Sequence, residues 1–155
     1  SDRIISAGDA LTLDFGCLYN HYVSDMTRTI YAGHVSDKER EIYETVLKAN
    51  QALISEAKAG LGFREFDKIP RDIIEAAGYG QYFTHGIGHG IGLDIHEEPY
   101  FNQTSKEVIK AGMVLTDEPG IYIEGLSGVR IEDDLLITET GCEVLTLAPK
   151  ELIVI

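Results

Sequence analysis

The sequence predicts an α+β domain with a largely antiparallel sheet. Strand-like segments occupy both ends of the chain, two helical segments follow each other between them, and no linker or low-complexity stretch divides them. A chain of 155 residues, of which 44% are apolar, suits one domain with a real core. Residues 1–155 are therefore expected to form a single domain.

The first strands predict a hairpin that carries two aspartates. Residues 10–16 (ALTLDFG) alternate in hydropathy, and residues 21–32 are rich in β-branched and aromatic types. A two-residue turn at 19–20 would place Asp14 directly opposite Asp25. Because like charges that oppose each other across a ladder are destabilising, a shared cation between them is expected.

Two helices are predicted next. Ser36 begins the first, since Ser36 and Glu39 form a capping-box pattern, and Gly60 ends it. The second runs from Phe63 to Ala77 and contains Pro70, which either kinks it or marks its true start.

Strands return after the helices and carry a second acidic pair. The predicted strands cover residues 83–91, 113–118, 120–123, 128–138 and 143–147. Glu118 and Glu132 are symmetric about Gly125, so a hairpin centred there would oppose them, with a bulge expected at Pro119-Gly120. One such pair is commonly surface charge, but two pairs inside apolar strands favour a cation site.

The run THGIGHGIGLDIHEEP, residues 84–99, combines three histidines with four glycines. Glycine at every second position disfavours a helix and lets another backbone or a substrate approach closely. Four residues of strand span roughly 13 Å, so His85 and His89 are too far apart to share one ion. One imidazole would bind metal while the other reaches along a cleft. The run lacks the phosphate-loop and HExxH patterns.

These residues together indicate a hard, oxygen-rich site. Four carboxylates and one imidazole favour Mn²⁺, Co²⁺ or Fe²⁺ over a thiolate type of zinc site. Five side chains, some of them bridging, suit two ions roughly 3.5–4 Å apart. Such ions would generate a hydroxide near neutral pH. They would also stabilise the oxyanion that forms when this hydroxide attacks a carbonyl.

Composition excludes several other classes. The net charge of −13 disfavours a nucleic-acid binder, because phosphates would be repelled. No apolar run is long enough for a transmembrane helix, and the first residues lack a signal-peptide pattern. Two cysteines, Cys17 and Cys142, are too few for a disulfide framework, so a cytoplasmic setting is expected.

The motifs LDFG, SDMTRT, HGIGHGIGLDIHEEP, LTDEPGIY and GVRIEDD span residues 11–134. In order and spacing they resemble the catalytic domain of the pita-bread metallopeptidases, peptidase family M24, and within it Xaa-Pro dipeptidase (prolidase) and aminopeptidase P. The resemblance implies metal ligands at Asp14, Asp25, His89, Glu118 and Glu132. It also implies proton shuttling by Glu118, substrate orientation and transition-state stabilisation by His85 and His96, and substrate binding by Arg130.

By resemblance, the function is that of a metallo-exopeptidase with two divalent ions. Mn²⁺ is the first choice, with Co²⁺, Fe²⁺ or Zn²⁺ as alternatives, and a metal-bridging hydroxide would hydrolyse the bond preceding proline in Xaa-Pro dipeptides or N-terminal Xaa-Pro peptides. Two alternatives stay open. One is a non-catalytic pita-bread domain that binds peptides. The other is methionine aminopeptidase, which His85 and the EPGIY motif disfavour.

Family members carry an N-terminal domain and further helices before the LDFG strand. The resemblance thus implies a pita-bread fold truncated at its N-terminal half, a C-terminal portion of the catalytic domain with a curved sheet. The sheet face that those helices would cover should be apolar and open. The expected partners are a proline-containing peptide substrate and a second copy that forms a homodimer, or another association, through that face; no nucleic acid or membrane is expected.

Overall fold

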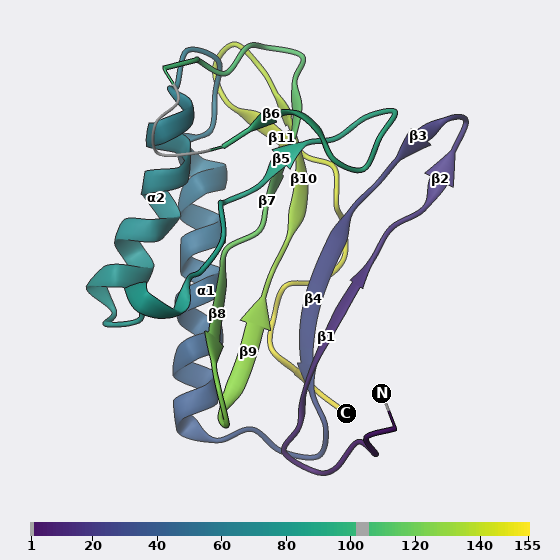
Figure 1. Cartoon of the computed structure of the whole chain (residues 1–155), viewed down its shortest axis with the longest axis vertical. Helices are drawn as coiled ribbons and strands as arrows, with labels where there is room; N and C mark the ends of the chain where they lie inside the picture. The colour runs from purple at the N-terminus through teal and green to yellow at the C-terminus, as the bar shows by residue number, and fades with distance from the viewer. Residues whose placement is uncertain (1, 102–105) are drawn as a thin grey trace.

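A computed structural model describes residues 2–101 and 106–155. Two helices, α1 (Asp37–Glu56) and α2 (Phe63–Ala76), stand side by side along one side of the molecule, and the strands lie beside them (Figure 1). The strands are β1 (Ala10–Phe15), β2 (Leu18–Tyr19), β3 (Tyr22–Val23), β4 (Met26–Tyr31), β5 (His89–Gly90), β6 (Glu97–Tyr100), β7 (Val114–Asp117), β8 (Gly120–Ile123), β9 (Ser127–Arg130), β10 (Asp133–Ile137), β11 (Cys142–Val144) and β12 (Ile153–Val154). All strand pairs in the described part are antiparallel except β4 with β12, so the predicted α+β class is confirmed.

The first hairpin forms, but its predicted register is wrong by two positions. The turn lies at Asn20 and His21, which have positive φ angles of 48° and 72°, and Asp14 pairs with Thr27 rather than with Asp25. Positive φ at both central residues is what a type I′ turn requires, and this sets the register. A shift of two residues keeps Asp14 and Asp25 on the same face of the sheet.

Both helices form, but the first ends at Glu56, with Ala57 as its C-cap, before the predicted stop at Gly60. Ser36 caps α1, because its hydroxyl accepts from the backbone N–H of Glu39 at 3.3 Å and its own N–H donates to the Glu39 carboxylate at 3.0 Å. The second helix begins at Phe63 and runs through the buried Pro70, which therefore does not mark its start. Ala77 is its C-cap, followed by Gly78 at a φ of 86°.

The core lies between the helices and the strands that face them. Apolar side chains from α1, α2 and β7–β10 are almost fully buried there, among them Ile42, Val46, Leu53, Phe66, Ile74, Leu115, Ile121, Val129 and Leu135. The five-stranded sheet, in the order β11-β10-β7-β5-β6, packs its inner face against this core and holds the centre of the candidate site.

The second acidic hairpin has the predicted register. Asp117 pairs with Asp133 on one side of the interruption and Gly120 pairs with Arg130 on the other, so both ladders are symmetric about Gly125, which has a φ of 76°. Each strand contributes two residues between the ladders, so the predicted bulge at Pro119-Gly120 does not occur. The predicted strands 128–138 and 143–147 are shorter, as β9, β10 and β11.

The predicted strand over residues 83–91 is wrong for most of its length. A 3₁₀ turn, η1 (Gly80–Tyr82), precedes it, and only His89–Gly90 form strand β5. The glycines do permit close approach of other backbone: a Cβ on Gly88 would lie 2.2 Å from the Thr116 carbonyl oxygen, and one on Gly90 would lie 2.5 Å from that of Glu98. Backbone groups from Phe83 to Ile87 bond to side chains of α2 in place of a ladder.

One face near the N-terminal hairpin is open and apolar. In the three-stranded sheet β1-β4-β12, β1 is an edge strand, and the hairpin exposes Leu13, Phe15, Leu18, Tyr19 and Tyr22. An apolar cluster of this kind agrees with the expected open sheet face, and the expected homodimer stays a prediction. Within residues 2–101 and 106–155, neither helix has the length and apolar character that crossing a bilayer needs.

Candidate metal centre

The five predicted ligands converge, although they come from separate elements. Their donor atoms fall into overlapping groups of three, and the atoms within each group lie within 4.8 Å of one another. The groups are Asp25–His89–His96, His89–Glu118–Glu132 and Asp14–Asp25–Glu132. Since Asp25, His89 and Glu132 each belong to two groups, the cluster offers more donor atoms than one ion needs. His96, which was not among the predicted ligands, adds a donor at one end.

The imidazole of His89 is oriented by its backbone neighbours. Its Nδ1 lies 3.0 Å from the Gly90 carbonyl oxygen, to which an N–H at Nδ1 donates, so that Nε2 presents a lone pair. That Nε2 lies 3.5 Å from Oε1 of Glu118 and 3.9 Å from Oδ2 of Asp25. The hydroxyl of Thr116 accepts from the His89 backbone N–H at 2.9 Å and donates to Glu118 at 3.2 Å, which ties the two together.

Burial makes the charged forms of these carboxyls costly. Burial raises the pKa of Glu118 to about 7, and burial together with the charge of Glu118 raises the pKa of Glu132 to about 8. Burial and the charge of Asp14 also raise the pKa of Asp25, and burial lowers the pKa of His89. Oδ1 of Asp25 is buried and has no hydrogen-bond partner among the described residues. Crowded carboxyls with an unpartnered oxygen fit divalent cations.

Among the described residues, Arg130 is the Arg or Lys whose side chain bonds to a predicted ligand carboxylate. Its guanidinium donates to the Asp14 carboxylate, to the Thr27 hydroxyl at 3.1 Å and to the Tyr122 hydroxyl at 3.3 Å. Thr27 in turn donates to Oε2 of Glu132 at 2.5 Å. One guanidinium leaves most of the acidic charge of the cluster uncompensated.

His85 and His96 flank the ligands on the side of an open cavity of about 340 Å³. His85 Nε2 lies 2.8 Å from the Tyr122 hydroxyl, and burial lowers the pKa of His85. The His96 ring packs edge-on against the His89 ring, with centroids 4.3 Å apart. The residues lining the cavity are His85, Gly86, Gly88, His89, His96, Tyr100, Phe101, Glu118 and Arg130. All predicted catalytic and substrate-binding residues thus share one cavity.

Several supporting residues were not predicted. The hydroxyls of Thr27 and Thr116 bond to the predicted ligands Glu132 and Glu118, and the hydroxyl of Tyr122 bonds to His85. The Asp25 backbone N–H donates to Asp134 at 3.1 Å. Thr27 and Tyr122 lie inside the motifs SDMTRT and EPGIY, so the motifs contain these residues but do not reveal which groups they contact. The contacts come from pairing across elements, which no local pattern specifies.

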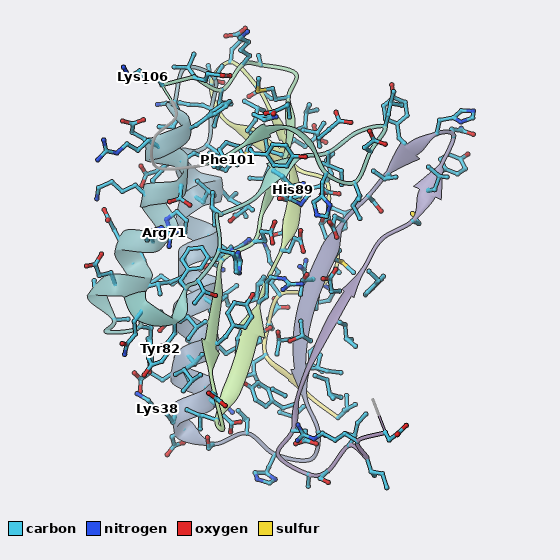
Figure 2. All side chains as sticks on the ribbon, viewed as in Figure 1. Lys38, Arg71, Tyr82, His89, Phe101 and Lys106 are labelled. Atoms are coloured by element: carbon cyan, nitrogen blue, oxygen red, sulfur yellow. The ribbon has the colours of Figure 1, made fainter. Side chains whose placement is uncertain are left out.

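A second buried polar cluster lies behind the ligands. Asp133, next to Glu132, is completely buried and bonds to Arg28 at 2.8 Å and to Lys150 at 2.7 Å. Asn50 of α1 donates to both Asp133 and Asp117. Figure 2 shows His89 in the middle of the molecule, between the helical side and the β1–β4 hairpin. The predicted ligand Glu132 therefore lies next to a buried network of hydrogen bonds and ion pairs.

The model of the metallopeptidase family M24 matches residues 1–139. The chain belongs to metallopeptidase family M24. Its donor set of carboxylates and one central imidazole agrees with the divalent metal that the family name implies.

Relatives and solved structures support this placement. The chain is 53% identical over 153 residues to the Xaa-Pro dipeptidase of Pyrococcus furiosus, covering 99% of this chain and 44% of that protein. It matches the structure of a Xaa-Pro dipeptidase from Bacillus anthracis with a TM-score of 0.98 and 53% identity, over 100% of this chain and 44% of that one. It also matches an X-Pro aminopeptidase from Thermotoga maritima with a TM-score of 0.96 and 40% identity, with the same coverage. The predicted pita-bread fold is confirmed, and the chain spans less than half the length of these relatives.

Proposed function

We propose that the chain forms the metal-binding part of a peptidase that hydrolyses the peptide bond preceding proline. The observation that carries the proposal is the convergence of Asp14, Asp25, His89, Glu118 and Glu132 on overlapping positions with uncompensated acidic charge. These five side chains would hold two divalent ions, Mn²⁺ first. When bound, such ions supply a water that ionises near neutral pH and a Lewis acid for the carbonyl oxygen.

The chain's own residues would handle protons and the substrate. Glu118 lines the cavity and is hydrogen-bonded to Thr116, so it is placed to accept a proton and return it. His85 and His96 would orient the peptide from the cavity wall. Arg130 adds a positive charge to that wall, which favours carbonyl or carboxylate oxygens of the substrate.

Proline specificity is inferred from relatives named as Xaa-Pro dipeptidase and X-Pro aminopeptidase. Both names share the bond before proline and differ in peptide length, so the substrate class is a Xaa-Pro dipeptide or a longer peptide that begins Xaa-Pro. We also place the protein in the cytoplasm, because a reducing compartment suits its free thiols, Cys17 and Cys142.

Metal content tests the proposal directly. After loading with Mn²⁺ and desalting, elemental analysis should find about two ions per chain in the wild type and about one or fewer in Asp25→Ala. Asp72→Ala, which removes an exposed carboxylate of α2, is the matched control and should keep the wild-type content. Absence of retained metal in the wild type would contradict the proposal.

Activity assays then separate the outcomes. Hydrolysis of a Xaa-Pro dipeptide but not of a Xaa-Pro-Xaa tripeptide would assign a dipeptidase, and the reverse would assign an aminopeptidase. A chain that keeps two ions and binds both peptides without cleaving either would be a binding domain, and the catalytic part of the proposal would be rejected.

A further inference from the structure

The segment that carries His85 is not held by a strand ladder. Residues 83–88 lie between η1 and β5 and have no assigned helix or strand, yet Phe83 and Ile87 are almost fully buried. Buried backbone groups need partners, so something other than a sheet must satisfy them. Two side chains of α2 bond to three of these groups, and the Ile87 carbonyl oxygen accepts from the Glu118 backbone N–H at 2.9 Å.

Asp67 and Arg71, one turn apart on α2, bond to this segment. Arg71 donates to the carbonyl oxygens of Phe83 at 3.2 Å and His85 at 2.9 Å, and Asp67 accepts from the N–H of Ile87 at 3.1 Å. Figure 2 places Arg71 on α2, and Figure 1 shows the chain that leads into β5 passing beside that helix. The two side chains thus bond three backbone groups within five residues.

The same two residues hold each other in a fixed geometry. Arg71 Nε donates to Asp67 Oδ2 and its terminal nitrogen donates to Asp67 Oδ1, both at 2.9 Å. Such a planar, two-bond pair is stiffer than a lysine contact, which is a single point charge. Asp67 is only 2% exposed, so its charge is buried together with the bonds that offset the cost of burial.

Contacts between rings connect the Asp67–Arg71 pair to the His85 imidazole. The Arg71 guanidinium lies over the Phe83 ring, 4.2 Å from its centroid, and the Phe83 ring meets the His85 ring edge-on with centroids 5.1 Å apart. On its other side, His85 is fixed by the Gly86 carbonyl oxygen at Nδ1 and the Tyr122 hydroxyl at Nε2, both at 2.8 Å. Asp67 and Arg71 do not line the cavity that holds Glu118 and His96, but they line an adjoining cavity together with Phe83 and His85.

We propose that the Asp67–Arg71 ion pair is a positioning device that aims the His85 imidazole into the substrate cavity. Both are positioning residues, because they act through the backbone and the Phe83 ring and do not line the cavity that holds Glu118 and His96. This inference rests on the proposed function in one respect, that His85 contacts the peptide substrate. The placement of His85 itself is independent of any activity.

The test uses conservative variants and a control on the same helix. Arg71→Lys keeps the charge but loses the two-bond fork, and Asp67→Asn keeps the shape but loses the charge. Lys68 and Asp72 form an exposed ion pair with the same spacing on α2, so the Lys68→Met/Asp72→Asn variant removes a pair without touching the His85 segment. Arg71→Lys decides the test if Asp67→Asn does not fold.

The first readout is the ring ¹⁵N spectrum of His85 in the neutral imidazole form. A fixed ring between one carbonyl and one hydroxyl gives two clearly different nitrogen shifts in the wild type and in the control. In Arg71→Lys the two shifts should move toward each other as the ring samples both tautomers. Wild-type shifts in both Arg71→Lys and Asp67→Asn would overturn the proposal.

The second readout is hydrolysis of a Xaa-Pro dipeptide with Mn²⁺ content verified as equal. Arg71→Lys should lower kcat by about tenfold to a hundredfold, as expected for a misplaced catalytic group, while KM changes less. A wild-type protein without activity would refute the proposed function. The His85 spectrum would still test whether the Asp67–Arg71 pair positions the His85 ring. A shifted spectrum with unchanged kcat would overturn the claim that this positioning serves catalysis.

Discussion

Binding of Mn²⁺ to the metal-free chain should release protons, and the number should depend strongly on pH. The reason is that Glu118 and Glu132 hold protons near neutral pH in the absence of metal, with pKa values of about 7 and about 8, whereas a carboxyl must lose its proton to become a ligand. The perturbation is the addition of metal at a fixed pH.

The magnitude follows from those two pKa values. At pH 6 both carboxyls are largely protonated, so their ionisation on loading should release about two protons. At pH 9 this contribution should fall to about 0.1, which leaves about one proton from the metal-bound water. Glu132→Gln, which has no proton to lose at that position, should release about one proton fewer at pH 6. Glu44→Gln, an exposed change on α1, should match the wild type.

Titration calorimetry measures this release directly. The binding enthalpy at one pH is compared in two buffers with different ionisation enthalpies, and the difference gives the protons released per chain. An equal release at pH 6 and pH 9, or a Glu132→Gln variant with the wild-type number, would refute the assignment of these glutamates as ligands.

The same pKa values set the stability of the metal-free chain. Both folded pKa values lie above the ordinary value of 4.5, so between pH 4.5 and about 8 the folded chain binds more protons than the unfolded chain. Its free energy of unfolding therefore falls as the pH rises through this window, and the penalty is absent below pH 4.5. Urea unfolding with a chelator should give a lower midpoint at pH 8.5 than at pH 5.5, and saturating Mn²⁺ should narrow that difference.

Four further outcomes are expected. Gly88→Ala should lower the free energy of unfolding by about 2–3 kcal/mol, because its Cβ would meet a β7 carbonyl oxygen, whereas Gly141→Ala, with open space around it, should be nearly neutral in urea denaturation. Lys150→Met should cost about 1–3 kcal/mol by removing a partner of the buried Asp133, and thermal unfolding would detect it. Ser36→Ala should cost about 1 kcal/mol through loss of the capping box, measured in the same way. Sedimentation velocity should show self-association that weakens when the exposed apolar residues of the β1–β3 hairpin are replaced by serine.

Local signals predicted the elements that depend on local chemistry. The capping box at Ser36 needs only residues three apart, and it forms. The pairing of Glu118 with Glu132 about Gly125 was also predictable, because one glycine with positive φ sets the register of both ladders. The register around Asp14 was missed by two positions, since Asn20 and His21 both adopt positive φ, and histidine is a less obvious turn residue than asparagine.

Long-range contacts explain what the sequence did not reveal. Residues 83–87 have the alternation of a strand, but α2 supplies their hydrogen bonds through Asp67 and Arg71, which lie 12–20 residues away without a recognisable pattern. Thr27 reaches Glu132 across 105 positions, and such contacts exist only once both hairpins are in place. Candidate ligands could be proposed from motifs, whereas the groups that contact them could not.

The place of β4 in its sheet has a consequence for the order in which the protein can fold. Its neighbours are β1, which is close in sequence, and β12, which pairs with it through Ile153 and Ile30. Contacts between such distant positions are slow to form, because a large loop must close first. During synthesis on the ribosome, the predicted ligands of the first hairpin therefore cannot join the site until Glu132 has emerged. The sheet around β4 is complete only after β12 has emerged. We expect metal capture to be a late event of biosynthesis, with the first hairpin exposed until then.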